Sequence, residues 1–148
     1  GYLKNLTNSL IKNIKKLKLN DKKNNYDFKF RLHPANNINK LLKNSDYDNG
    51  ANIYESVIDK NIVIVTGDSS ASIDAYNLNK KIIIYLGNKS LNINSLRNFE
   101  GVDFARNITD IKNFLTNYRK EIINKVFNNY KHYYYKNINY ERWKKLLI

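Results

Sequence analysis

The sequence contains no cysteine and only two histidines among its 148 residues. The lack of cysteine excludes disulfide bonds, thiolate-bound zinc, iron–sulfur clusters and cysteine nucleophiles. His33 and His132 cannot by themselves form a three-histidine metal centre. No pair of carboxylates stands out at metal-ligand spacing. We therefore expect no metal ion and no resident cofactor.

Glycine is scarce as well, with five in the chain, and there is a single proline. Neither G-x-G-x-x-G nor G-x-x-x-x-G-K-[ST] occurs, which argues against a conventional dinucleotide enzyme and against a P-loop enzyme. The G-x-S-x-G turn of serine hydrolases is also absent, and no base is evident for the nearest serine, Ser69. These three enzyme classes are poor interpretations of the sequence.

Long hydrophobic runs are missing too. The longest extend from Ile62 to Val65 and from Ile82 to Leu86, whereas roughly 20 apolar residues are needed to span a bilayer. The first helix-like stretch carries lysines throughout, unlike a signal peptide. We expect a soluble, cytoplasmic protein with one core, because 148 residues with 42% apolar composition suffice for one domain.

Positive charge is the strongest feature of the composition. Lysine and arginine total 26 against 13 acidic residues, so the formal net charge is +13. Such a surplus favours polyanions as partners. Two interpretations stay open at this point: a functional basic patch, or a basic surface that is merely solvated.

The hydrophobic pattern of the first third predicts a helix followed by a strand. Apolar residues recur at steps of three and four from Leu3 to Leu17, which is typical of an amphipathic helix. Apolar and charged residues then alternate from Tyr26 to Leu32, which predicts a strand that ends at His33-Pro34. A short helix near Ile38 to Leu42 and a surface loop from Asn44 to Asn52 follow.

The middle of the chain predicts a βαβ unit. Ile62 to Val65, and Ile82 to Leu86 in the predicted strand from Lys81 to Leu86, are continuous apolar runs, typical of strands buried on both faces. Between them, the turn at Gly67 to Ser70 opens a helix that runs to about Asn77. A short helix from Ile53 to Ile58 precedes the unit.

The last part of the chain is mainly helical by pattern. Val102 to Ala105 predicts a fourth strand, and Asn107 can cap a helix that runs to about Asn117. Its inward residues are Ile108, Ile111, Phe114 and Leu115. Another helix carries Ile122, Ile123, Val126 and Phe127, and an aromatic-rich, helix-like tail runs from Tyr130 to Ile148.

The order of these elements predicts an α/β fold, with a Rossmann-like, doubly wound parallel sheet and helices on both faces. Residues 1–118 would form this domain, and residues 119–148 a carboxy-terminal helical extension.

Ligands in such sheets bind beyond the carboxyl ends of the strands, where two short motifs lie. In the first, Thr66 to Ser70, a glycine allows close backbone approach and two hydroxyls stand at a helix start, which suits an anion. The alternative is that Asp68 or Ser69 is only an N-cap. In the second, Arg31 to Pro34, a histidine stands at a strand end, where it could equally be structural.

Together the two motifs resemble the donor-nucleotide half of glycosyltransferases with the two-domain GT-B architecture. The chain is similar to bacterial sialyltransferases, polysialyltransferases, capsule Kdo transferases and teichoic-acid glycerophosphotransferases, in which His-Pro and Ser-Ser motifs flank a cytidine nucleotide. The likeness covers roughly Tyr26 to Leu115. Within this range the segments that carry the likeness, besides Arg31 to Pro34, are Ser69 to Tyr76, Lys80 to Ile84, Leu91 to Leu96 and Gly101 to Phe104.

The resemblance implies a nucleotide-binding set composed of Arg31, His33, Pro34, Gly67, Asp68, Ser69, Ser70 and Asp74. In it, His33 would contact the ribose or a phosphate, and Ser69 with Ser70 would hold a phosphate. Arg31 would be an additional cation, unless it simply points into solvent. Asp74 matches an acidic position of the pattern, or else only complements the helix dipole. The resemblance assigns no catalytic residue.

The resemblance further implies capsule or lipopolysaccharide biosynthesis with a CMP- or CDP-activated donor. The acceptor-binding amino-terminal domain, which supplies the catalytic base, has no room in 148 residues, so the isolated chain should be inactive. The aromatic tail would contact that domain, an anionic membrane, or one face of the sheet. A membrane contact would place the protein peripherally on the inner face of the membrane.

Two departures from the family pattern concern the motifs themselves. Gly67-Asp68 precedes Ser69-Ser70 where glycerophosphotransferases show Asp-Tyr, and Asn94-Ser95-Leu96 lacks the proline of the usual Ser-Pro-Leu. A glycerophosphotransferase-like domain and a homologous domain without activity remain alternatives.

The main alternative outside enzymes is a basic nucleic-acid-binding α/β module. The net charge and the aromatics between Tyr130 and Trp143 favour it. Because the basic residues are spread over the whole chain and no reader motif occurs, we expect no nucleic-acid partner.

Overall fold

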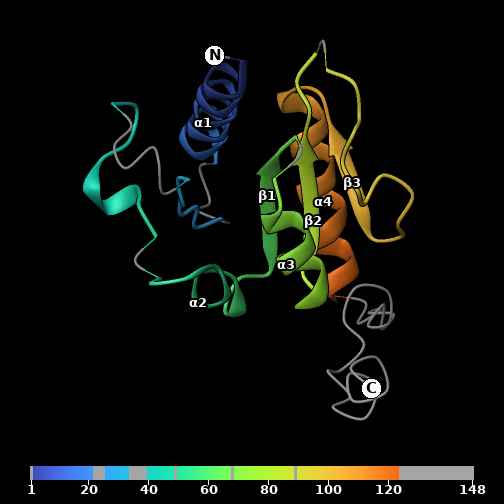
Figure 1. The fold of residues 1–148 in the computed structure, drawn as a ribbon. Coiled ribbons are helices and arrows are strands. Elements are labelled where there is room, and N and C mark those ends of the chain that lie inside the picture. The colour runs from blue at the N-terminus through green and yellow to red at the C-terminus, as the bar shows by residue number, and fades with distance from the viewer. Residues whose placement is uncertain are drawn as a thin grey trace, which may run out of the picture.

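The computed structural model describes residues 2–21, 26–33, 40–48, 50–67, 69–88 and 90–123. Figure 1 shows its elements in chain order. They are α1 (Tyr2–Asn20), the 3-10 turn η1 (Asn44–Asp46), α2 (Ile53–Ile58), β1 (Ile62–Thr66), α3 (Ala71–Asn77), β2 (Lys81–Tyr85), β3 (Val102–Ala105) and α4 (Ile108–Ile123).

The three strands form one parallel sheet in the order β1-β2-β3. β2 is central: Ile83 pairs with Ile64 on one side and with Asp103 on the other. Helix α3 makes the crossover from β1 to β2, and an irregular segment joins β2 to β3. The predicted α/β class is confirmed. Within the described strands, however, the order follows the chain without the reversal that a doubly wound sheet has.

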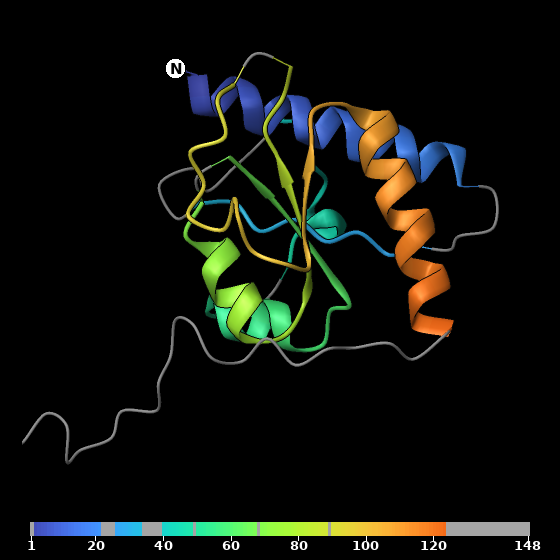
Figure 2. The same cartoon turned by 90° about the vertical axis from the view of Figure 1, so that its right-hand side faces the viewer.

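Helices cover both faces of the sheet, as predicted, because the side chains of β2 alternate between two cores. The first, the α1–α4 core, lies between the sheet and helices α1 and α4. It contains Leu6, Leu10, Ile14, Ile83, Tyr85, Ala105, Ile111 and Leu115. The second, the α2–α3 core, covers the other face. It contains Val57, Val65, Ala75, Tyr76, Ile82, Ile84, Leu86 and Leu96. Figure 2 shows α1 and α4 on one side of the strands and α2 and α3 on the other.

The predicted strand from Tyr26 to Leu32 is wrong. Residues 26–33 form only one parallel bridge, in which the Phe30 amide donates to the Asp46 carbonyl (2.8 Å) and the Asp48 amide donates to the Phe30 carbonyl (3.0 Å). The alternation does identify the inward side, since Tyr26, Phe28 and Phe30 pack against the α1–α4 core. A ladder does not form because η1 curls the neighbouring segment away immediately before the bridge.

Three further expectations need correction. β1 is not buried on both faces: of its residues only Val65 is buried, because β1 has one neighbour in the described sheet. Helix α4 does not end at about Asn117 but continues to Ile123. Of the short helix expected near Ile38 to Leu42, residues 40 and 41 form a turn, and Ile38 and Asn39 lie outside the described residues. Val126, Phe127 and the aromatic tail also lie outside.

The expected cap of α4 is present. The Asn107 side-chain oxygen accepts a hydrogen bond from the Asp110 amide (3.0 Å), and the Asp110 carboxylate accepts from the amides of Arg106 (2.8 Å) and Asn107 (3.3 Å). This reciprocal arrangement satisfies amides that the first turn of a helix leaves without partners. It fixes the point where the chain leaves the carboxyl end of β3.

Candidate functional site

The turn after β1 lies at the carboxyl edge of the sheet. Gly67 has φ +46°, a left-handed conformation that favours glycine, and its amide donates to the Tyr85 carbonyl at the end of β2 (2.9 Å). The Leu6 side chain lies against this turn: a Cβ on Gly67 would stand 3.6 Å from Leu6 Cδ2. Helix α1 therefore forms one wall of the carboxyl edge.

Ser69 and Ser70 follow this turn and lead into α3. The Ser69 carbonyl accepts from the Ser72 amide (3.1 Å) and from the Ser72 hydroxyl (2.8 Å). Ser70 holds the N-cap position, but its side chain makes no capping hydrogen bond. Within the described residues, neither the Ser69 hydroxyl nor the Ser70 hydroxyl has a hydrogen-bond partner. Of the two expected N-cap residues, Ser69 therefore makes no capping hydrogen bond and Asp68 is not among the described residues; the hydroxyls of Ser69 and Ser70 can both serve a ligand.

Two other members of the expected set belong to this turn and helix. Asp74 lies half-buried in the first turn of α3, where a carboxylate complements the helix dipole. Asp68 lies outside the described residues. The Gly67, Ser69 and Ser70 positions are thus the part of the expected serine motif that the structure locates at the edge of the sheet.

Arg31 takes part in a hydrogen-bond network just before and within α2. Its Nη1 donates to the Ser56 hydroxyl (2.8 Å) and to the Gly50 carbonyl, its Nη2 donates to the Ala51 carbonyl (3.3 Å), and Nη1 stands 3.6 Å from the Asp48 carboxylate. Because four protein acceptors surround it, the guanidinium does not point only into solvent. It holds Asp48, Gly50 and Ala51 near Ser56 of α2.

His33 is exposed beside a cleft of about 340 Å³ in this same region. Phe30 and Tyr47, which form the backbone bridge, supply aromatic walls, and Asp48 supplies a carboxylate. Pro34 lies outside the described residues. The cleft combines aromatic surface with a histidine, which suits a flat polar ligand.

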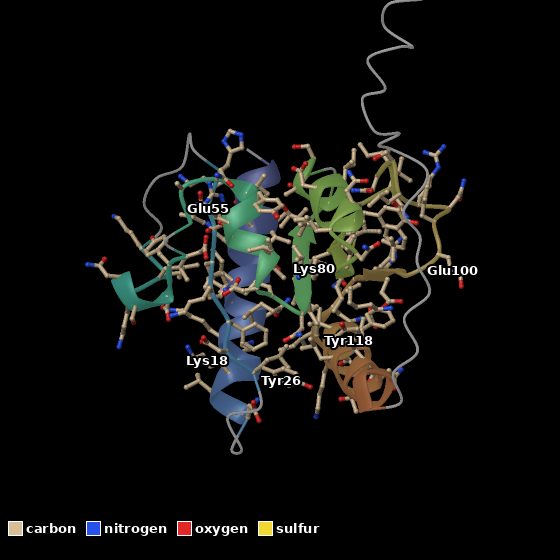
Figure 3. All side chains as sticks on the ribbon, turned by 90° about the horizontal axis from the view of Figure 1, so that it is seen from below. Lys18, Tyr26, Glu55, Lys80, Glu100 and Tyr118 are labelled. Atoms are coloured by element: carbon tan, nitrogen blue, oxygen red, sulfur yellow. The ribbon has the colours of Figure 1, made fainter. Side chains whose placement is uncertain are left out.

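The amino ends of α2 and α3 lie on the same side of the molecule. Lys80, three residues after α3, donates from Nζ to the carbonyl of Ile58, the last residue of α2, so the carboxyl ends of the two helices are adjacent. The helices are short, pack against each other and run side by side, as Figure 3 shows between Glu55 on α2 and Lys80 after α3. The Arg31 network at the start of α2 and Ser69-Ser70 at the start of α3 are therefore on one side. The cleft beside His33 does not itself include either serine.

Asn94 joins two segments of this region, a role that its place in the Asn94-Ser95-Leu96 motif did not predict. Its side chain is 2% exposed; Nδ2 donates to the Gly67 carbonyl (2.7 Å) and lies 3.4 Å from the Ser72 hydroxyl, while Oδ1 accepts from the Leu96 amide (2.9 Å). It ties the irregular segment after β2 to the turn after β1. The Asn94-Ser95-Leu96 motif holds this connection without the proline of the family pattern.

Tyr85 anchors α1 at the same edge, a second contribution that sequence patterns did not reveal. Its hydroxyl, in a side chain that is 3% exposed, lies 3.0 Å from the Ser9 hydroxyl and accepts from Asn13 Nδ2 at 3.1 Å. Both partners stand on α1, more than 70 residues away in the chain. The sequence pattern predicted only that Tyr85 is buried.

A metal centre or a membrane span would have changed the interpretation of this site. In the ranges that the structure describes, no three histidine, aspartate or glutamate residues gather as a metal-binding group would. Nor does any helix in those ranges combine the length and the apolar character needed to cross a bilayer.

Comparison with protein-family models, with curated proteins and with solved structures finds no match to this chain. The assignment of a function therefore depends on the geometry described above and on the motifs of the sequence.

Proposed function

We propose that the chain is the donor-nucleotide-binding domain of a GT-B-type glycosyltransferase that builds cell-surface polysaccharide, with a cytidine-activated sugar or polyol as donor. One observation carries the proposal: the Arg31–His33 motif and the Ser69-Ser70 motif stand at the amino ends of two helices packed side by side. Ser69 and Ser70 also follow a strand of a parallel sheet, at the edge where such sheets bind ligands.

Each motif has a distinct part in this proposal. The hydroxyls of Ser69 and Ser70 donate to a phosphate of the nucleotide, and the turn at Gly67 lets the backbone approach it. His33 contacts the ribose or a phosphate from the neighbouring cleft. Arg31 acts as a positioning residue, because it holds Asp48 and Ala51, which line that cleft.

The chemistry requires such donors. Transfer of the sugar breaks its bond to the nucleotide phosphate, and negative charge grows on the departing phosphate oxygen. Hydroxyl groups and a cationic or neutral imidazole fixed around that oxygen stabilise the charge without reorganisation. The acceptor and its catalytic base belong to a second domain, so we expect this chain to bind donor without turnover.

Calorimetric titration of the chain with CMP, CDP, UDP and GDP tests the proposal. We expect saturable binding of a cytidine nucleotide. Binding should weaken about tenfold or more in His33→Ala and in the double variant Ser69→Ala/Ser70→Ala, because each change removes hydrogen bonds to a charged ligand. The double variant Ser45→Ala/Thr109→Ala, which removes two exposed hydroxyls elsewhere, should bind like the parent chain.

Unchanged affinity in both site variants would contradict the site assignment. A parallel titration with a short single-stranded oligonucleotide at two salt concentrations distinguishes the donor-nucleotide domain from the main alternative, a nucleic-acid-binding module. Oligonucleotide binding that falls steeply with salt, with no nucleotide binding, would identify a basic nucleic-acid module instead. CDP-glycerol binding without binding of a CMP-sugar would favour the glycerophosphotransferase branch.

A further inference from the structure

The protein holds the carboxylate of Asp48 by one oxygen only. Its Oδ2 accepts hydrogen bonds from the Ser56 hydroxyl and from the Gly50 amide (3.2 Å), and Arg31 Nη1 lies 3.6 Å from the same atom. Among the residues that the structure describes, the other oxygen, Oδ1, has neither a hydrogen-bond partner nor an ion pair. These contacts orient the carboxylate and leave one of its two acceptor atoms unused.

The backbone around this carboxylate is closely packed, so its orientation is built into the fold. A Cβ on Gly50 would stand 2.6 Å from the Ser56 hydroxyl oxygen and 3.1 Å from Asp48 Oδ2, so a larger residue does not fit without a shift. The Asp48 amide donates to the Phe30 carbonyl (3.0 Å), which holds its backbone as well. With 12% of its side chain exposed, Asp48 has little freedom to turn.

The same carboxylate lines the cleft beside His33. This cleft has a volume of about 340 Å³, and Leu32, Tyr47 and Ala51 also belong to its lining. An acceptor that loses water without gaining a partner costs free energy. A ligand that fills the cleft must therefore bring a hydrogen-bond donor to Asp48.

The pyrimidine bases differ in what they present to such an acceptor. Cytosine carries an exocyclic amino group, N4, which donates, whereas uracil carries at that position the oxygen O4, which accepts. Because an ionised carboxylate has no proton to donate, it pairs with N4 but repels O4. A carboxylate at this place therefore separates the two bases.

Ligand groups with two neighbouring donors fit less well. The N1 and N2 donors of guanine, or the two hydroxyls of a ribose, pair with a carboxylate through both of its oxygens. Here Oδ2 already accepts from Ser56 and Gly50, so one acceptor remains. A single donor such as the amino group of cytosine matches what is left.

We propose that Asp48 selects cytosine over uracil by accepting a hydrogen bond from the N4 amino group through Oδ1. The inference rests on the proposed function, because it requires the nucleotide to enter the cleft beside His33. It adds a residue that reads the base, which neither sequence motif supplies. Arg31 orients the carboxylate for this contact.

Calorimetric titration of the parent chain and of Asp48→Asn with CMP and UMP tests the proposal. The parent should bind CMP about tenfold or more tightly than UMP, because O4 and the carboxylate have no proton between them. The amide of Asp48→Asn can donate to O4 or accept from N4, so the CMP-to-UMP ratio should fall to about threefold or less. Asp27→Asn, which neutralises an exposed carboxylate in residues 26–33, should keep the ratio of the parent.

A change in the ligand tests the same contact without a change in the protein. The monophosphate of pyrimidin-2-one riboside is CMP without its amino group, and it should bind the parent chain about tenfold more weakly than CMP. Deoxy-CMP should bind as CMP does, because the contact is to the base. AMP carries the same kind of amino group on a larger ring and should bind no more tightly than CMP.

The outcomes separate this proposal from the function on which it rests. An unchanged CMP-to-UMP ratio in Asp48→Asn, or equal affinity for CMP and its analogue without the amino group, would overturn the proposal and leave the donor-nucleotide function standing. Weak binding of deoxy-CMP, with equal losses for CMP and UMP in Asp48→Asn, would overturn it and assign Asp48 to the ribose. Tighter binding of AMP would overturn the assignment to cytosine. Binding of none of these nucleotides would contradict the proposed function itself, and this inference with it.

Discussion

At the scale of single residues, the buried hydroxyl of Tyr85 ties the central strand β2 to helix α1. Tyr85 belongs to an apolar run, and its burial follows from that pattern. Its hydroxyl partners, Ser9 and Asn13, stand on α1 and could not be inferred, since no local spacing links them to β2. For Arg31, the motif suggested ligand binding but gave no sign that its guanidinium holds Asp48, Gly50 and Ala51 near α2.

Tyr85→Phe should lower the free energy of unfolding by about 1–2 kcal/mol, because a buried hydroxyl loses its partners on α1. Urea denaturation measures the change. Tyr54→Phe is the matched control, since Tyr54 is 52% exposed and should change stability by less than about 0.5 kcal/mol. Equal effects of the two substitutions would mean that the Tyr85 hydroxyl does not anchor α1.

At the scale of elements, continuous apolar runs and turn residues predicted β1, β2, β3, α2 and α3 well. The alternating segment from Tyr26 to Leu32 did not become a strand, although its aromatic residues face the core as the pattern requires. Alternation fixes which side faces inward, but a strand also needs an extended neighbour with free backbone groups, and here only Phe30 has one. Helix α4 exceeded its predicted length because Tyr118, one turn beyond Leu115, is also buried and donates to the Asn61 carbonyl (3.2 Å).

The contact between η1 and α1 gives a pH-dependent prediction. The Lys43 amide donates to the Asp46 carboxylate (3.0 Å), and Lys15 and Lys18 lie 3.5 and 3.9 Å from it, so the pKa of Asp46 is lowered below 3.8. Because the folded-state pKa is the lower one, the stabilisation is complete above the unfolded value of 3.8. It is lost as the pH falls from there through the folded pKa.

Asp46→Asn should therefore lower stability by about 0.5–1 kcal/mol at pH 7, and the difference from the parent chain should shrink as the pH falls below about 4. Denaturation of the two proteins between pH 2 and pH 7 measures it. A difference that stays constant over this range would show that the carboxylate charge of Asp46 does not stabilise the contact.

At the scale of the whole molecule, the α/β class and the covering of both faces followed from the order of the patterns along the chain. The position of the Arg31–His33 motif relative to the Ser69-Ser70 motif did not follow from that order. It depends on α2 and α3 packing side by side, which the Lys80–Ile58 contact reveals and which no spacing in the sequence encodes. The hydrophobic pattern also did not predict that α1 covers the carboxyl edge. This covering depends on contacts of Leu6 with Gly67 and Gly87, which are distant in the sequence.

The proposed nucleotide site lies at the amino ends of α2 and α3. Its most direct test is to follow the backbone amide resonances of the isotope-labelled chain by NMR during titration with CMP. We predict the largest shifts at Gly67, Ser69, Ser70 and His33, and none at Lys81 and Tyr118 at the opposite edge of the sheet. Shifts confined to that opposite edge, or no shifts at any concentration, would contradict the account.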